Sequence, residues 1–282
     1  MTDYNGKVVV ITGAANGIGK ELALRFADSK AKLALADIDK ENLEAVGKEI
    51  KGKGADVLTS VLDVSDYGAM ENFSKAIFEK FGNVDYLFNN AGVISGGTIW
   101  EMPLNEWDWL FNVNVMGIVN GVKLFVPSMI KQDTECKVVN TASFAGLTSG
   151  ENLPAYVASK FAALSLTEVL ELQLQEAAPK VKAYAVCPAV VKTDLKNCMR
   201  HRPAELYNPD DPYYKTEDYK KKEANIQNAI DTGKPVNEAV NTILEGIEND
   251  IFYILTHPEY NPLIGLRAQN IMKGTRPVKF QQ

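Results

Sequence analysis

The sequence has little of what metal sites and disulfide scaffolds require. It contains three cysteines and two histidines in 282 residues, and none of them has the spacing of a zinc motif. Cys136 and Cys187 border apolar runs, so we expect both to be small core residues, whereas Cys198 lies in a polar segment and is expected to be a free thiol. We therefore predict no metal site and a reducing, cytoplasmic location.

Basic charge and long apolar runs are scarce as well. Thirty Lys and Arg residues against 36 Asp and Glu residues give a net charge of -6, which disfavours a nucleic-acid partner because such proteins need a basic face. No uninterrupted run approaches the ~18 apolar residues of a membrane span. The opening stretch MTDYNGKVVVITGAA lacks the pattern of a signal peptide. We expect no membrane partner and a small-molecule substrate.

Apolar runs that are rich in β-formers alternate with longer helical patterns. The runs that read as strands are 7–12, 32–37, 56–61, 84–89, 136–141, 182–187 and 251–255. The helical patterns are 17–29, 39–51, 66–81, 105–131, 155–178 and 236–247. Most strand runs are continuously apolar, as strands buried on both faces are. The alternation predicts an α/β fold, a doubly wound seven-stranded parallel sheet with helices on both faces, in a single domain over 1–282.

Residues 194–235 break this rhythm. They hold eight acidic and eight basic side chains, four tyrosines and several prolines. Long connections in compact domains are often lids or binding loops. This one follows the sixth strand, and ligands of open α/β sheets bind beyond the carboxyl ends of the strands. We therefore interpret it as a substrate lid, with a plain surface excursion as the alternative.

The stretch TGAANGIG lies between the first strand and the first helix. Its glycines would permit a tight turn at Gly13, close approach of backbone N–H groups to a pyrophosphate at Gly17, and close helix–strand packing at Gly19. We assign Asn16 and Ile18 to the same contact. An ordinary glycine-rich turn is the alternative interpretation, but the position between strand and helix favours a nucleotide.

Asp37 ends the second strand, 18 residues after Gly19. That is close to the spacing of the acidic residue that binds the adenosine ribose, and its carboxylate would repel a 2′-phosphate. We predict NAD rather than NADP as the cofactor, with Ile38 beside it. Asp39 fits better as the cap of the next helix, and Lys40 is a nearby cation that would soften the preference.

Two further strand ends carry candidate nucleotide contacts. Asp63 and Val64, in LDVSD, are expected to contact adenine, although turn and helix-capping chemistry through Ser65 or Asp66 is the alternative. The stretch NNAG closes the fourth strand, and its last three residues, Asn90, Ala91 and Gly92, are expected to let the backbone pass close to the nucleotide.

Several motifs in order resemble the classical short-chain dehydrogenase/reductase family. They are TGAANGIG, NNAG, Asn114 in NVNVMG, Ser143 in NTASFAG, and Tyr156 with Lys160 in YVASK, and the match runs from about residue 7 to Thr193. The resemblance implies a Rossmann-type fold, with Ser143, Tyr156 and Lys160 as catalytic residues and Asn114 as a fourth member. Taken singly, these residues also fit an exposed helix pair, a turn serine and a helix-kinking amide.

The spacing of Tyr156 and Lys160 has a physical rationale of its own. Residues four apart share a helix face. A phenol has a pKa of about 10, and an ammonium ~4 Å away at an effective dielectric of ~20 supplies about 4 kcal/mol, enough to bring that pKa near 7. We therefore expect Lys160 to lower the pKa of Tyr156, and Tyr156 to exchange a proton with the substrate oxygen that Ser143 holds. The resemblance implies that Asn114 holds a water connecting Lys160 to solvent.

The stretch CPAVVKT follows the sixth strand. By resemblance, Pro188, the Val191 backbone and the Thr193 hydroxyl bind the nicotinamide end of the cofactor, as do Tyr156 and Lys160. The family usually has Pro-Gly here, whereas this chain has Ala189 after Pro188, so we expect a slightly altered backbone.

Two expected helices, 105–131 and 155–178, are apolar over most of their circumference and must be covered on more than one side. We favour a homodimer seam there, with a neighbouring helix as the alternative. The chain lacks the Asp-Gly-Gly type of ending with which many family members build a tetramer, so we expect the dimer and keep the tetramer as the alternative assembly.

Apolar residues should wall the substrate cleft. They are Val93, Ile94, 144–147, Ala189, Leu195 and Met199. They favour a hydrophobic secondary alcohol or ketone, steroid-like or terpenoid. A non-catalytic NAD-binding sensor or scaffold would be expected to lose Tyr156 or Lys160. A sugar-nucleotide epimerase or dehydratase would carry another glycine spacing and a separate C-terminal domain.

Overall fold

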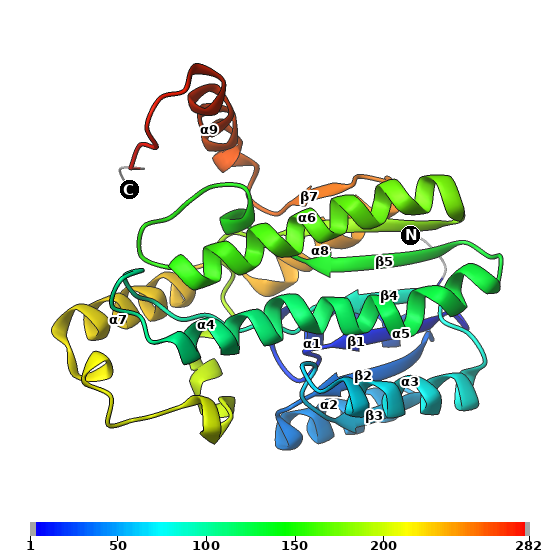
Figure 1. The fold of residues 1–282 in the computed structure, drawn as a ribbon. Coiled ribbons are helices and arrows are strands. Elements are labelled where there is room, and N and C mark those ends of the chain that lie inside the picture. The colour runs from blue at the N-terminus through cyan, green and yellow to red at the C-terminus, as the bar shows by residue number, and fades with distance from the viewer. Residues whose placement is uncertain (1–3, 280–282) are drawn as a thin grey trace.

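The core of the protein is one parallel sheet. The structure, a computed structural model, describes residues 4–279. Within them the strands are β1 (Val8–Thr12), β2 (Lys32–Asp37), β3 (Val57–Val61), β4 (Tyr86–Asn89), β5 (Cys136–Thr141), β6 (Val181–Cys187) and β7 (Tyr253–Leu255). They pair in the order β3-β2-β1-β4-β5-β6-β7, and every pairing is parallel (Figure 1). The predicted doubly wound sheet is confirmed.

Helices cover both faces of this sheet. They are α1 (Gly17–Asp28), α2 (Lys40–Gly52), α3 (Tyr67–Phe81), α4 (Leu104–Phe111), α5 (Gly117–Lys131), α6 (Pro154–Ala177) and α8 (Val236–Glu248). Val9 and Ile11 of β1 pack with α1, α2 and α8, while Val8 and Val10 pack with α3, α5 and α6. Both faces of the strand are therefore buried, which explains its continuous apolar run.

Side-chain caps set where two helices begin. The Asp39 carboxylate accepts from the Asn42 amide at 3.1 Å, and Asp66 accepts from the Ala69 amide at 3.0 Å. The capping role that the sequence offered for both residues is confirmed. The helices consequently begin one residue after the expected starts at 39 and 66.

The helix expected over 105–131 is interrupted. A widened π turn, η1 (Asn112–Met116), separates α4 from α5 and carries Asn114 inward. By length and mean hydropathy, 1.5 over its most apolar window, Leu104–Lys131 would suffice to cross a membrane, so the sequence argument from uninterrupted runs understated it. However, 50% of that window is buried inside the protein, which is typical of a core helix.

The two ends of the long segment after β6 are held together by an isolated bridge outside the main sheet. Val191 forms a parallel bridge with Lys234, whose amide donates to the Val190 carbonyl at 2.9 Å. Between these ends lie three short helices, η3 (Asp194–His201), η4 (Ala204–Leu206) and η5 (Pro212–Lys215), and then α7 (Glu217–Asp231). Sequence reasoning did not predict α7, because its face is largely polar and little of it is buried.

A buried ion pair attaches this segment to the body. Arg202 bonds Glu106 of α4, and both side chains are fully shielded from solvent. The Tyr214 hydroxyl donates to the same carboxylate at 2.7 Å, and the guanidinium lies 5.0 Å from the ring centroid of Trp109. Removing either charge would leave the other buried without its partner, so the segment is firmly held at this point.

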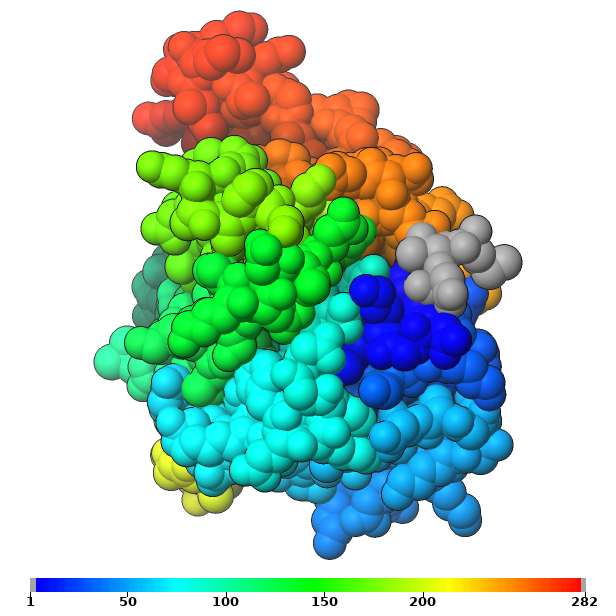
Figure 2. Space-filling model, turned by 90° about the vertical axis from the view of Figure 1, so that its right-hand side faces the viewer, coloured from blue at the N-terminus to red at the C-terminus, as the bar shows by residue number. Residues whose placement is uncertain are grey.

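The chain ends in a helix that sequence reasoning also missed. Helix α9 (Asn261–Lys273) follows the short η6 (Pro258–Tyr260), and none of its residues is buried. Figures 1 and 2 show it standing out from the body beyond β7. Tyr260 at its start contacts Phe144 with ring centroids 5.5 Å apart, so the base of this arm reaches the carboxyl edge of the sheet.

Candidate active site

One cavity of about 970 Å³ runs along the carboxyl edge of the sheet. It collects residues from the turns after β1, β2, β3, β4, β5 and β6 and from α6. The sequence-predicted residues that line it are Gly13, Asn16, Gly17, Ile18, Asp37, Ile38, Asp63, Val64, Asn90, Ala91, Gly92, Ser143, Tyr156, Lys160, Pro188, Val191 and Thr193. Gly19 and Asn114 lie behind this surface. A volume of this size is at the upper end of the usual range for small-molecule and cofactor sites.

The glycines of the turn after β1 are places where no side chain fits. Gly13 and Gly17 have φ values of 65° and 53°, in the region that favours glycine. A Cβ on Gly17 would lie 2.9 Å from the Thr193 side chain, and one on Gly19 would lie 2.1 Å from the Gly13 carbonyl oxygen. The turn is therefore a bare backbone surface that opens a helix, as a pyrophosphate-binding turn requires.

Side chains of the neighbouring strands hold this turn in place. The Thr12 hydroxyl accepts from the amides of Asn90 and Ala91 at 3.0 and 3.2 Å. The Asn90 side chain donates to the carbonyls of Thr12 and Gly13, both at 3.1 Å. Asn90 thus lines the cavity, while its side-chain amide braces the glycine turn after β1.

Along the strand order, Asp37 and Tyr156 lie at opposite ends of the cavity. The Asp37 carboxylate accepts from the Ala15 amide at 2.8 Å and from the Asp39 amide at 2.9 Å. Burial raises its pKa, and these two backbone bonds only partly oppose the rise. Asp39 differs, because bonds from Arg200, Asn42 and Asn16 outweigh its own burial and hold its pKa below the usual value.

Asp63 lines the cavity and also forms the local turn with Ser65 that the sequence offered as an alternative role. It accepts from the amide and the hydroxyl of Ser65 at 2.8 and 2.7 Å, an Asx turn that leads into α3. Val64, next to it, packs against Gly117 so closely that a Cβ there would lie 2.7 Å from the Val64 side chain.

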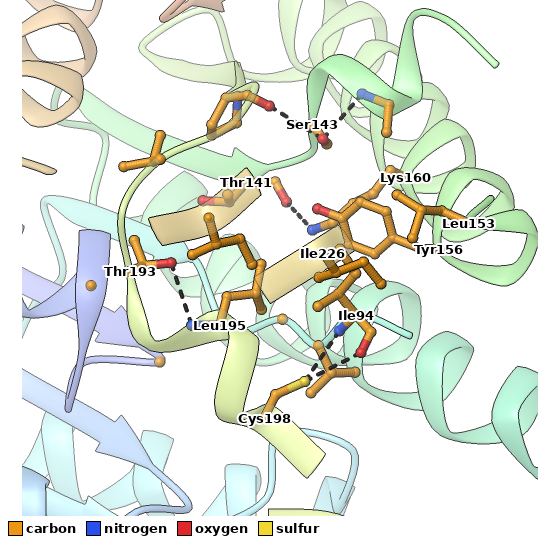
Figure 3. Close-up of a pocket in the computed structure, with 18 of the residues that line it drawn as sticks. Ile94, Thr141, Ser143, Leu153, Tyr156, Lys160, Thr193, Leu195, Cys198 and Ile226 are labelled. Carbon is orange, nitrogen blue, oxygen red and sulfur yellow. Dashed lines mark hydrogen bonds between the residues drawn. The ribbon is translucent and has the colours of Figure 1, made fainter. Parts of the chain in front are cut away.

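Tyr156, Ser143 and Lys160 converge at the other end of the cavity (Figure 3). The Lys160 ammonium donates to the Thr141 carbonyl at 2.9 Å and lies 5.6 Å from the ring centroid of Tyr156. The Ser143 hydroxyl donates to the Pro188 carbonyl at 3.2 Å and accepts from the Ala145 amide at 3.1 Å. The spacing of four residues does place the amine and the phenol together.

The expectation that Lys160 lowers the pKa of Tyr156 is wrong for the side chains of the protein alone. Burial raises the pKa of Tyr156, and a hydrogen bond with Ser143 only partly opposes the rise. Burial also lowers the pKa of Lys160, to about 8. The cation that was expected to stabilise a phenolate is thus itself destabilised by the same loss of hydration.

Asn114 is held by the Val93 backbone and the Ser159 hydroxyl. It is fully buried, its carboxamide oxygen accepts from the Val93 amide at 2.9 Å, and its nitrogen donates to the Val93 carbonyl and the Ser159 hydroxyl, each at 3.0 Å. A Cβ on Gly92 would lie 3.3 Å from the Asn114 oxygen and 3.4 Å from the Lys160 nitrogen. Asn114 and Lys160 therefore flank the same glycine.

The stretch after β6 needs no glycine conformation. Within residues 4–279, a non-glycine residue has a positive φ only at Lys30, Asp133 and Asp250, so Ala189 fits here without backbone strain. The slightly altered backbone expected at Pro188-Ala189 stays a prediction, because it concerns a difference from the family's usual Pro-Gly. The Thr193 hydroxyl lines the cavity and also accepts weakly, at 3.4 Å, from the Leu195 amide.

Comparison with known proteins decides the family. A family model described as short chain dehydrogenase matches residues 7–204. The chain belongs to the short-chain dehydrogenase family. It is an oxidoreductase with a dinucleotide-binding fold of the Rossmann type.

Similar proteins extend this match over the whole chain. A crystal structure of a short-chain dehydrogenase/reductase from Burkholderia phymatum in complex with NAD matches with a TM-score of 0.96 and 38% identity, covering 100% of both chains. The CLA biosynthesis dehydrogenase/reductase of Lactiplantibacillus plantarum is 40% identical over 277 residues, 98% of this chain and 97% of the relative. Meso-2,3-butanediol dehydrogenase of Serratia marcescens is 37% identical over 195 residues, 69% of this chain and 75% of its own.

The part of the cavity beyond Tyr156 in this short-chain dehydrogenase is mostly apolar. Of the expected wall, Val93, Ile94, Phe144, Ala145, Ala189 and Leu195 do line it. Gly146, Leu147 and Met199 do not; Leu147 and Met199 are partly buried in neighbouring hydrophobic clusters, and Met199 faces a second, separate pocket.

Other lining residues were missed from the sequence. They include Trp109, Thr148, Asn152, Leu153, Val157, Lys222, Asn225, Ile226, Tyr260 and Leu263. Those of α7 lie within residues 194–235, which we interpreted as a lid, but its largely polar pattern singled out no individual residue there. Those after β7 come from a segment for which the sequence predicted no site. The apolar residues after the last strand were the one available hint. Cys136 and Cys187 are buried core residues as expected, whereas Cys198, also a free thiol, is buried against Ile94.

Lys160 makes the stability of this short-chain dehydrogenase depend on pH. Its pKa is about 8 in the folded chain, against about 10.4 in an unfolded one. Between these values the unfolded chain binds the proton and the folded chain does not, so this group makes the free energy of unfolding rise with pH.

Replacing Lys160 with methionine should remove that rise. From urea unfolding at a series of pH values between about 7 and 10, we expect the wild type to gain about 3 kcal/mol relative to Lys160→Met. If the free energies of unfolding of the two proteins change in parallel with pH, burial does not destabilise the protonated Lys160 amine.

Proposed function

We propose that this chain is an NAD-dependent alcohol dehydrogenase or ketone reductase that interconverts a hydrophobic secondary alcohol and its ketone. The observation that carries the proposal is the convergence of Ser143, Tyr156 and Lys160 in the same cavity as the glycine turn. The apolar wall of Ile94, Leu153, Leu195 and Ile226 around them supports an apolar substrate (Figure 3). We place the enzyme in the reducing cytoplasm, which its three unpaired cysteines support and cell fractionation would test.

The residues of this chain fit a dinucleotide. The turn at Gly13–Gly19 presents bare backbone to a pyrophosphate, and Asp37 offers a carboxylate where an adenosine ribose would lie. Bound NAD would supply the hydride acceptor and a positively charged ring. The full-length similarity to a protein solved in complex with NAD supports this cofactor.

The catalytic steps assigned to the chain concern a proton. Tyr156 takes the hydroxyl proton of the alcohol as hydride leaves the carbon, and returns it to the oxygen in the reverse reaction. Ser143, whose hydroxyl lies between the Pro188 carbonyl and the Ala145 amide, turns to hold the same substrate oxygen. Lys160, with a pKa near 8, is able to pass a proton on at neutral to mildly alkaline pH. Asn114 positions Val93 and Ser159 beside this group.

Removing the phenol oxygen should separate binding from chemistry. Screening secondary alcohols with NAD⁺, by the absorbance of the reduced ring, identifies a substrate for the wild type. With it, Tyr156→Phe is expected to lose about 10²- to 10⁴-fold in turnover, the usual contribution of a general acid–base, while its Kd for NADH changes by less than about fivefold.

A matched control for this substitution is Tyr253→Phe. That change also removes a hydroxyl, one that donates to Glu168 outside the cavity, and should leave turnover unchanged. Tight binding of NADH by the wild type without oxidation of any alcohol or reduction of any ketone would favour the alternative, a non-catalytic NAD-binding sensor or scaffold.

Asp37 should set the preference for NAD over NADP. We expect the wild type to use NADP⁺ at least about 100-fold less efficiently, because the carboxylate repels a 2′-phosphate, and Asp37→Asn to narrow the gap about tenfold. The measurement is kcat/KM with each nucleotide. Equal efficiencies for the wild type would contradict the assignment of this carboxylate.

We also propose that the chain forms a homodimer through α5 and α6. Leu166, Val169 and Leu172 of α6 are 36%, 47% and 66% exposed, an apolar stripe that a second copy would cover. Sedimentation equilibrium should show a dimer that Leu172→Glu converts largely to monomer. Ile99→Glu, at another exposed apolar residue, should leave the dimer intact. A monomeric wild type would contradict the proposal.

A further inference from the structure

We propose that Arg200 is a nucleotide-retaining residue, which fastens the lid to the β2–α2 turn across the adenosine end of the cleft. The inference rests on the proposed function, in which this cleft holds NAD, and it assigns to residues 194–201 a role toward the nucleotide as well as toward the substrate.

A single guanidinium connects two segments that are distant in sequence. One Arg200 nitrogen lies 2.8 Å from the Asp39 carboxylate, and the other lies 2.6 Å from Asp194, the first residue of η3. Asp39 also accepts from the Asn16 side chain of the phosphate turn at 3.2 Å, and the His201 ring nitrogen lies 3.3 Å from the same carboxylate. The lid, the β2–α2 turn and the phosphate turn thus share one polar network.

This network lies on the wall of the cavity. Arg200 and His201 line the same cavity as Asp37 and Ile38, the residues at its adenosine end. The lid begins against the phosphate turn, since a Cβ on Gly17 would touch the Thr193 side chain. A nucleotide on that turn is therefore bordered by η3 on its outer side, and the Arg200–Asp39 contact must open for the adenosine end to leave freely.

The same short helix also forms part of the substrate wall. Leu195 and Cys198 belong to the hydrophobic cluster around Tyr156, and the Cys198 thiol donates to the Ile94 carbonyl at 3.3 Å (Figure 3). One face of η3 thus contacts the substrate half of the cleft, while Arg200 reaches the nucleotide half. Retention of the nucleotide and closure of the substrate cleft are coupled through this helix.

The lid offers a matched contact that does not reach the nucleotide. Lys196 of the same helix pairs with Asp231 at the end of α7, so both partners belong to the lid. Loss of this pair removes a charge from η3 without touching the β2–α2 turn. It therefore separates a general loosening of the lid from the specific effect of Arg200.

The test is the rate at which NADH leaves the holoenzyme. NADH bound to the protein is chased with excess NAD⁺ in a stopped-flow instrument, and fluorescence follows its release. We expect Arg200→Gln to raise the dissociation rate and the Kd for NADH by about five- to tenfold, the size of one charge-assisted contact at a half-exposed site. Lys196→Gln should keep the wild-type rate.

A second variant controls for an effect of the Arg200→Gln substitution on folding. Asp39→Asn keeps an efficient N-cap for α2 but loses the charge that Arg200 contacts, and it should raise the dissociation rate to a similar extent. The double variant should then be no faster than either single one, because both remove the same interaction.

The outcomes distinguish this inference from the proposed function. If the wild type binds NADH and Arg200→Gln releases it at the wild-type rate, the retaining role is wrong while the enzyme assignment stands. Equal acceleration by Lys196→Gln would also overturn the role, because it would show a general loosening. A wild type that binds no NADH would overturn both proposals.

Discussion

The site depends on how closely the turn after β1 approaches its neighbours. The Gly13 carbonyl lies where a Cβ of Gly19 would be, and Asn90 donates to that carbonyl and to the one before it. Thr12 in turn accepts from the first two amides after β4. No side chain fits between these backbones, so the spacing of the glycines follows from packing as well as from the need for open N–H groups.

A parallel sheet explains why the remaining site residues gather beside this turn. All strands end at one edge, so Ser143 after β5, Pro188 after β6 and the first turns of α6 meet there. The enclosure that excludes water destabilises the phenolate of Tyr156 and the ammonium of Lys160. It therefore raises the pKa of Tyr156 and lowers that of Lys160. The pKa values of the pair therefore depend on the whole enclosed site and not on their mutual spacing alone.

The segment 194–235 lies only partly within the family model. The family model ends at residue 204, within this segment, whereas similar proteins that match the whole chain extend beyond it. The segment is tied at its base by the bridge between Val191 and Lys234, and further along by the buried pair of Arg202 and Glu106. Two residues that line the cavity, Ile226 and Leu263, lie beyond the end of the family model.

Local patterns in the sequence determined the strands, the capped helices and the order of the motifs, because continuous apolar runs, helix caps and glycine spacing act over a few residues. Tertiary structure alone decided what depends on distant partners. The polar helix α7 and the exposed α9 have no strong local signal, and Arg200 meets Asp39 across 161 residues. The pKa of Tyr156 likewise follows from burial, which no spacing of four residues reveals.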